Sequence, residues 1–91
     1  MSYQRDRILE VNPDALLWDE LDSCIIGITD DGRAVYDIYA MEIVTQKLND
    51  WEFVEASEWV EYNILRAPIG DFSPIHIWVM PDEIIPNETN D

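Results

Sequence analysis

Basic side chains are scarce in this sequence. Its 91 residues include 5 Lys or Arg against 20 Asp or Glu, which gives a formal net charge of −15 at pH 7. Direct binding to nucleic acid or to an anionic membrane needs Lys and Arg to neutralise phosphate, so the composition argues against both partners. Solubility alone asks for a net charge of magnitude about 2–8 in a small domain. The excess of carboxylates therefore requires a further explanation.

Cysteine is nearly absent as well. Cys24 is the only one, so no disulfide can form within the chain, and its neighbours Ile25 and Ile26 favour a buried, unreactive thiol. The sequence also lacks an apolar run of about 18 residues, the length of a membrane-spanning helix. Its polar N-terminus does not resemble a signal peptide. We therefore expect a cytoplasmic protein that makes no membrane contact.

Motifs that carry catalysis or bind cofactors are also missing. The sequence has no glycine-rich phosphate loop, no Cys-x-x-Cys, no His-Glu-x-x-His and no Gly-x-Ser-x-Gly. His76, the only histidine, is expected to be a hydrogen-bonded strand residue rather than a metal ligand. Asp30-Asp31-Gly32 favours a hairpin turn over a calcium loop, because the positions that follow carry no ligands. We expect no enzymatic activity, no metal and no cofactor.

Apolar residues, by contrast, are sufficient for a folded core. They make up 47% of the sequence and include four Trp and four Tyr. Length and pattern predict one domain, residues 1–91, with a polar N-terminal arm at 1–11 that ends in a short extended piece. An acidic, flexible tail is expected at 82–91.

Local signals predict the element order α-ββ-αα-β. Asn12-Pro13-Asp14 has the features of a helix start, which predicts a short helix to about residue 23. Strands are expected at 24–29 and 34–38, joined at Asp31-Gly32 by a two-residue type I′ turn. Further helices at 39–48 and 52–65 and a last strand at 75–80 follow. The simplest packing is an α+β two-layer domain, an antiparallel sheet of about three strands with helices on one face.

Several segments together are similar to a known family. They are residues 21–28, 32–37, Met41, 55–63 and 70–75. Their pattern, spread over residues 21–77, resembles that of short uncharacterised proteins of bacteriophages and archaeal viruses. Asp37 departs from the pattern, where Ser is common, and the acidic tail is not part of it. The resemblance implies a viral origin and an accessory role in the host cell cytoplasm, and it transfers no catalytic residue.

The helix expected at 52–65 carries a row of carboxylates. Asp50 precedes a row of glutamates that recur at every third position, Glu52, Glu55, Glu58 and Glu61, and at 100° per residue such a row winds around the solvent side of the helix. Neighbouring glutamates at this spacing repel by about 0.2–0.5 kcal/mol per pair. Two interpretations remain open: a merely solvated surface, or a surface made for a basic groove.

The charge density limits how closely this helix can copy DNA. One carboxylate per about 4.5 Å of helix is sparser than the one charge per about 1.7 Å of a duplex. Acidic residues of the first expected helix and a symmetric partner chain would raise the density. Trp residues at the surface would supply interface anchors, although Trp59 is expected to fill the core.

These features favour a non-enzymatic viral protein that binds and inhibits a host protein with a basic surface. The target would be a nucleic-acid-handling defence factor, blocked by partial nucleic-acid mimicry as anti-restriction and anti-CRISPR proteins do. The candidate partner-binding residues are Asp50, Glu52, Glu55, Glu58, Glu61, Asp19, Asp22 and Trp51.

Two other functions remain open at this point. One is a module that sequesters a small signalling ligand through Arg33 or Arg66, and the other is an accessory protein of virion assembly. A homodimer formed through the exposed edge of the hairpin is open as well.

Overall fold

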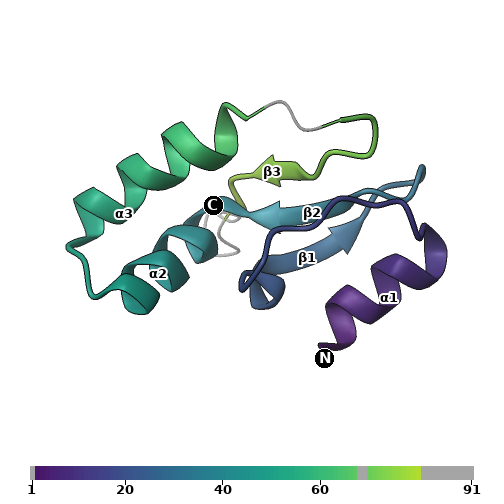
Figure 1. Ribbon diagram of the computed structural model, residues 1–91, viewed down its shortest axis with the longest axis horizontal. Coiled ribbons are helices and arrows are strands. Elements are labelled where there is room, and N and C mark those ends of the chain that lie inside the picture. The colour runs from purple at the N-terminus through teal and green to yellow at the C-terminus, as the bar shows by residue number, and fades with distance from the viewer. Residues whose placement is uncertain (1, 68–69, 81–91) are drawn as a thin grey trace, which may run out of the picture.

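The computed structural model describes residues 2–67 and 70–80. They form a small α+β domain with the expected order α-ββ-αα-β. The strands are β1 (Ile25–Ile28), β2 (Ala34–Asp37) and β3 (Ile75–Ile77), and the helices are α1 (Tyr3–Val11), α2 (Ile38–Asn49) and α3 (Phe53–Val60). Figure 1 shows α2 and α3 beyond one end of the sheet and α1 beside β1. The acidic tail at 82–91 lies outside the described residues.

The sheet is mixed rather than wholly antiparallel. Its strand order is β1-β2-β3, with β1 antiparallel to β2 and β3 parallel to β2. The two helices after β2 run out and back, and residues 70–74 lead into β3 from the end of the sheet where β2 begins (Figure 1). A third strand entered from that end must run parallel to β2. The expectation of an all-antiparallel sheet was therefore wrong in this one pairing.

The hairpin between β1 and β2 closes differently from the expected type I′ turn. The N–H of Thr29 donates to the carbonyl of Arg33 at 2.8 Å, so three residues form the loop. Only Gly32 has a positive φ, 86°, where a type I′ turn needs two such residues. A Cβ at Gly32 would also lie 2.7 Å from the Cβ of Asn12. Glycine is required here by both the backbone angle and the space.

Residues 3–11 form a helix, where a polar arm at 1–11 was expected. In α1 the Ser2 hydroxyl caps the first turn by accepting from the N–H of Arg5 at 3.0 Å. Ile8 is the only buried residue of α1. A helix that buries one side chain leaves almost no periodic apolar pattern in the sequence from which it could be predicted. Tertiary contacts hold the helix in place.

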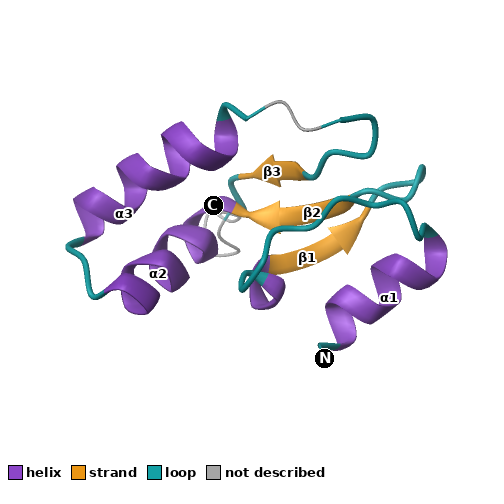
Figure 2. Ribbon diagram, in the orientation of Figure 1, coloured by secondary structure: helices purple, strands orange, loops and turns teal. Residues whose placement is uncertain are grey.

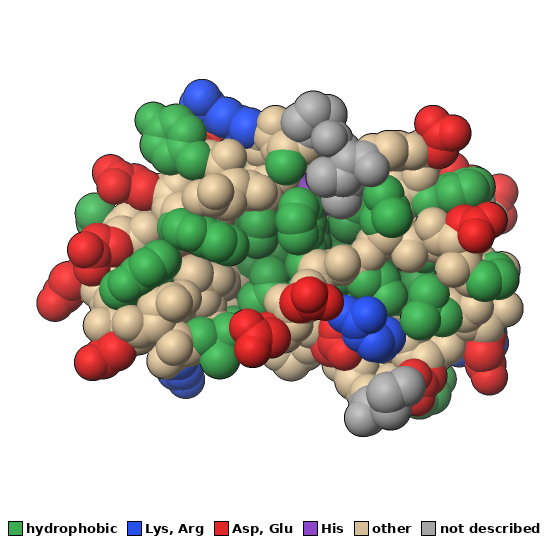
Figure 3. All heavy atoms as spheres, in the orientation of Figure 1, with side chains coloured by type: hydrophobic (Ala, Val, Ile, Leu, Met, Phe, Trp, Pro, Cys, Tyr) green, Lys and Arg blue, Asp and Glu red, His purple; other side chains and the backbone are tan. Residues whose placement is uncertain are grey.

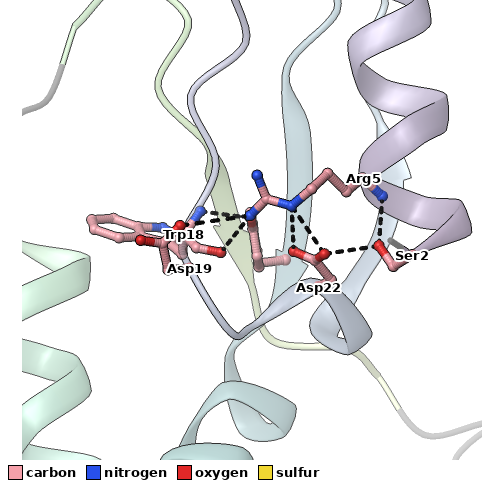
Figure 4. Close-up of polar contacts among 6 residues, drawn as sticks. Ser2, Arg5, Trp18, Asp19 and Asp22 are labelled. Carbon is pink, nitrogen blue, oxygen red and sulfur yellow. Dashed lines mark hydrogen bonds and ion pairs between the residues drawn. The ribbon is translucent and has the colours of Figure 1, made fainter.

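An ion pair provides the main polar contact of α1 with the rest of the chain. The Arg5 Nε lies 3.0 and 3.1 Å from the two oxygens of Asp22, and the Ser2 hydroxyl donates to the same carboxylate at 2.8 Å (Figure 4). Arg5 also donates to the carbonyl of Trp18 at 3.2 Å. The hydrogen bond from Arg5 lowers the pKa of Asp22. The ion pair thus joins α1 to Asp22, at the far end of the long segment between α1 and β1.

Residues 13–21 do not form the expected helix. They cross the sheet as a loop (Figure 2), which ends in a 3₁₀ turn, η1 (Asp22–Cys24). The Asn12 side chain accepts from the N–H of Asp14 and donates to the carbonyl of Gly32 at 3.1 Å, so it stabilises a turn against the hairpin instead of capping a helix. The loop then covers β2.

The core lies around Tyr36 of β2, which is fully buried. The Tyr36 hydroxyl accepts a hydrogen bond from the N–H of Trp18 at 2.9 Å, and the Trp18 indole donates to His76 Nε2 at 3.0 Å. His76 is therefore a hydrogen-bonded strand residue, as predicted, and Cys24 is buried, as predicted. Burial raises the pKa of the Cys24 thiol. The remaining core residues are Ile8, Ala15, Leu21, Ile25, Ala34, Ile38, Met41, Val60 and Ile64.

The α2–α3 contact contains a buried carboxylate. Glu42 of α2 is 5% exposed and accepts a hydrogen bond from the Ser57 hydroxyl of α3 at 3.0 Å. A buried carboxylate without a partner would cost several kcal/mol, so this hydrogen bond fixes how the two helices meet. The contact sets the orientation of α3 and hence of its outward face.

Protonation of His76 is expected to destabilise the fold. Burial lowers the pKa of His76, whereas the unfolded chain titrates near about 6.5. The stabilisation from the neutral ring is complete above that value and is lost as pH falls from it towards the folded pKa, because the unfolded chain takes up the proton first. The Tm measured from about pH 7.5 to 5.5 should therefore decline through the lower half of this range.

The matched variant is His76→Gln, which keeps an acceptor for the Trp18 indole and removes the titrating group. Its Tm should stay nearly constant over the same pH range, above the region in which carboxylates titrate. An equal decline in both proteins would show that His76 is not the group responsible.

Candidate functional site

The inward face of α3 determines which side chains point to solvent. Ala56, Val60 and Ile64, spaced four residues apart, are 0, 0 and 1% exposed. Side chains on the opposite side of the same helix therefore remain outside the core. The four Glu of the acidic row do not all share that side, because each successive one is rotated by about 60°. Only the middle two, Glu55 and Glu58, lie near its centre.

The start of α3 is built by the first two glutamates of the row. Glu52 is the N-cap residue, and its side chain accepts from the backbone of Glu55. The Glu55 carboxylate in turn accepts from the N–H of Glu52 at 3.1 Å. This reciprocal capping box satisfies two otherwise unpaired N–H groups and places negative charge at the positive end of the helix dipole. Glu52 and Glu55 thus have a structural role in addition to their charge.

The end of α3 continues into a π-helical turn, η2 (Glu61–Leu65). In a π-helix residues five apart lie above one another, and Arg66 accordingly contacts Glu61, with its Nε 3.0 Å from the carboxylate. The Arg66 guanidinium also lies over the Tyr62 ring, 5.1 Å from its centroid. The last carboxylate of the row is thereby paired within the chain.

Between these two ends lies a shallow hollow of about 340 Å³. The Trp51 and Trp59 rings meet at its edge at a tilt of 55°, with centroids 6.4 Å apart. Trp59 is 40% exposed and Tyr62 is 66% exposed. The lining residues, which we call the α3 stripe, are Trp51, Glu55, Glu58, Trp59, Tyr62 and Asn63. The stripe combines two carboxylates with exposed aromatic rings.

A second hollow, of about 260 Å³, shares Trp59 with the stripe. It lies between the 13–21 loop, α2 and α3, and its lining includes Asp19, Glu20 and Asn49. Glu20 has a φ of 67°, an uncommon backbone angle for a residue with a side chain. Trp59 thus has the α3 carboxylates on one side and the acidic Asp19-Glu20 turn on the other.

The other predicted site residues lie apart from the stripe or have separate roles. Asp50 is exposed and adopts the left-handed conformation, φ 57°, at the end of α2. Asp22 is held by Arg5 and Ser2 and takes no part in either hollow. Of the eight predicted residues, the stripe brings together Trp51, Glu55 and Glu58, and Asp19 lines the neighbouring hollow.

Sequence reasoning missed three members of the stripe. Trp59 was expected to fill the core but is 40% exposed, and Val60 and Ile64 are the buried residues of this part of the helix. Asn63 was not among the predicted site residues. Tyr62 was not considered. The signal was present in the spacing, because the stripe residues follow Trp51 by 4, 7, 8, 11 and 12 positions, which is one face of a helix.

A third hollow of about 220 Å³ lies between α1 and β1 and has a different character. Its lining is mainly apolar and includes Tyr3, Ile26 and Ile28, together with Arg7. Without an acidic residue in its lining, it offers nothing to a cationic partner.

Residues 2–67 and 70–80 contain no group of three or more His, Cys, Asp or Glu that could hold a metal ion. No helix among them is long and apolar enough to span a bilayer. No protein-family model matches the chain, and comparisons with curated proteins and with solved structures found no match. The α3 stripe and its neighbouring hollow are the site that the geometry offers.

The unbalanced charge should make stability depend on salt. Repulsion among the carboxylates opposes folding, while exposed ion pairs such as Arg7–Glu10 contribute little. Screening weakens the repulsion, so the Tm should rise between about 0.02 and 0.5 M NaCl. The Asp14→Asn/Asp30→Asn double variant, which removes two exposed charges, should show a smaller rise. A Tm of the wild type that is flat across this range would contradict the prediction.

Proposed function

We propose that this chain is a non-enzymatic binding protein that occupies the Lys/Arg-rich surface of a partner protein and thereby blocks nucleic acid from it. The observation that carries the proposal is the α3 stripe, in which Glu55 and Glu58 lie among three aromatic rings, two of them, Trp59 and Tyr62, exposed. The carboxylates make such a surface negative, and the aromatic rings provide contact area.

The aromatic residues distinguish the stripe from a merely solvated helix face. Trp and Tyr are enriched at interface hot spots because they bury a large area with few rotatable bonds. Trp59 lies partly exposed between two hollows, so the free protein leaves apolar surface in contact with water. A bound partner would remove that surface from water, which favours binding. The net charge of −15 would speed encounter with a cationic surface by electrostatic steering.

The distribution of charge favours competition over close imitation of a duplex. Figure 3 shows acidic side chains at both ends of the face in view and also near its middle, with hydrophobic side chains spread between them. Such a surface does not reproduce a regular line of phosphates. It needs only to overlap the basic surface that nucleic acid uses, which is partial mimicry in the functional sense.

The family resemblance of residues 21–77 supports a specific setting for this activity. A viral accessory protein that enters or is made in the host cytoplasm meets nucleic-acid-handling defence factors, whose working surfaces are basic. Inhibition of such a factor, of the anti-restriction or anti-CRISPR type, is the role we propose. The small-ligand alternative depended on Arg33 or Arg66, and both guanidinium groups are ion-paired, with Asp31 and with Glu61.

The proposal predicts that neutralising the stripe abolishes binding. In the Glu55→Gln/Glu58→Gln variant, glutamine can still complete the capping box, so the helix is kept while two charges are lost. Immobilised protein should capture basic, nucleic-acid-binding proteins from host lysate, in amounts that fall with rising salt and on addition of duplex DNA. The variant should retain at most about a tenth of this capture.

The matched control is Asp14→Asn/Asp30→Asn, which removes the same charge from two exposed residues far from α3. It should capture nearly as much as the wild type. Equal losses in the two variants would mean that only net charge matters. Undiminished capture by Glu55→Gln/Glu58→Gln, or capture indifferent to DNA, would overturn the proposal.

A further inference from the structure

The outward face of α3 and η2 contains the same two-residue pattern twice. A glutamate directly precedes an aromatic residue in Glu58-Trp59 and again, one turn later, in Glu61-Tyr62. The structure completes the two pairs differently.

The second pair has a cation of its own. Arg66 follows Glu61 by five residues and Tyr62 by four, and its guanidinium contacts both: Nε lies 3.0 Å from the Glu61 carboxylate, and the group lies over the Tyr62 ring. A guanidinium between a carboxylate and an aromatic face combines charge-assisted hydrogen bonding with a cation–π contact. The chain thus shows which group such a pair accommodates.

The first pair has a neutral residue at the corresponding offset in the sequence. Asn63 follows Glu58 by five residues and Trp59 by four, and its side-chain amide donates to the carbonyl of Trp59 at 3.0 Å. The hollow of about 340 Å³ is lined by this pair together with Trp51, Glu55, Tyr62 and Asn63 itself. Among the described residues, no Lys or Arg lines it. The hollow therefore offers the same kinds of group as the second pair, a carboxylate and an aromatic ring, without a cation from the chain itself.

We propose that the hollow of the α3 stripe binds an arginine side chain of the partner protein, with the guanidinium against Glu58 and Trp59 as Arg66 lies against Glu61 and Tyr62. This inference rests on the proposed function and specifies the group recognised. Glu55, which also lines the hollow, supplies a second negative charge.

Arginine fits this arrangement better than lysine. Its guanidinium is planar, presents donors at fixed angles and is weakly hydrated, so it can stack on an indole while it hydrogen-bonds a carboxylate. A lysine ammonium is a compact, strongly hydrated charge that gains the electrostatic attraction but less of the stacking. The site should therefore discriminate between two probes of equal charge.

The test measures affinity for acetylated, amidated hexa-arginine and hexa-lysine peptides by calorimetry at one ionic strength. Wild-type protein should bind hexa-arginine about threefold to fivefold more tightly than hexa-lysine. Asn63→Arg places a guanidinium at the position that Arg66 holds for the next pair, so it should fill the hollow from within and reduce the preference to below about twofold.

Two controls separate this effect from charge and from misfolding. Asn63→Gln alters the same position without a cation, and Asp14→Asn shifts net charge by the same one unit away from the stripe, so both should keep the arginine preference. Trp59→Leu removes the aromatic face of a partly exposed residue and should lose the preference even if Asn63→Arg is poorly folded by circular dichroism.

The outcomes distinguish this inference from the function on which it rests. Equal binding of the two peptides by the wild type, with both weakened in Glu55→Gln/Glu58→Gln, would overturn the arginine site and leave the basic-surface proposal standing. An arginine preference that persists in both Asn63→Arg and Trp59→Leu would likewise overturn it. Failure of the wild type to bind either peptide would overturn both.

Discussion

The burial of three side chains, Ala56, Val60 and Ile64, is the constraint on which the site depends. Their four-residue spacing leaves α3 one way to face the core, and the hydrogen bond between Ser57 and Glu42 fixes its contact with α2. Every member of the α3 stripe is outward because these positions are inward. The carboxylates of the stripe therefore sit on a rigid element, held in place by packing that involves none of them except through the helix cap.

The elements whose apolar pattern is strong could be predicted from the sequence. β1, β2, α2 and the continuous helical segment of α3 and η2 begin and end close to their expected bounds, because each has a clear alternation or a helical period. α1 could not be found in this way, since it buries only Ile8 and depends on the distant pair Arg5–Asp22. The helix start predicted at Asn12 was wrong for a related reason. Its side chain hydrogen-bonds the carbonyl of Gly32 in the hairpin and does not cap a helix that follows.

The candidate site was partly visible in the sequence for the same physical reasons. The period of the glutamates placed Glu55 and Glu58 on the solvent side, where the structure has them. It could not show that Glu52 caps the helix, that Glu61 is paired with Arg66 through a π-turn, or that Asp22 is held by α1. Those roles arise from backbone geometry and from contacts between distant segments. They divide a uniform acidic row: Glu52 and Glu55 form the helix cap, and Glu61 is paired with Arg66. Of the four, only Glu55 and Glu58 line the hollow beside the aromatic rings.

The proposed function depends on cations binding at the α3 stripe and not over the acidic surface at large. Backbone and indole chemical-shift changes, recorded for every residue during titration with hexa-arginine, test this most directly. The proposal predicts that the largest changes lie at Trp51, in 55–63 and at the Trp59 indole, and that the exposed acids Asp14 and Asp30 change little. Changes of similar size at all exposed carboxylates would contradict it.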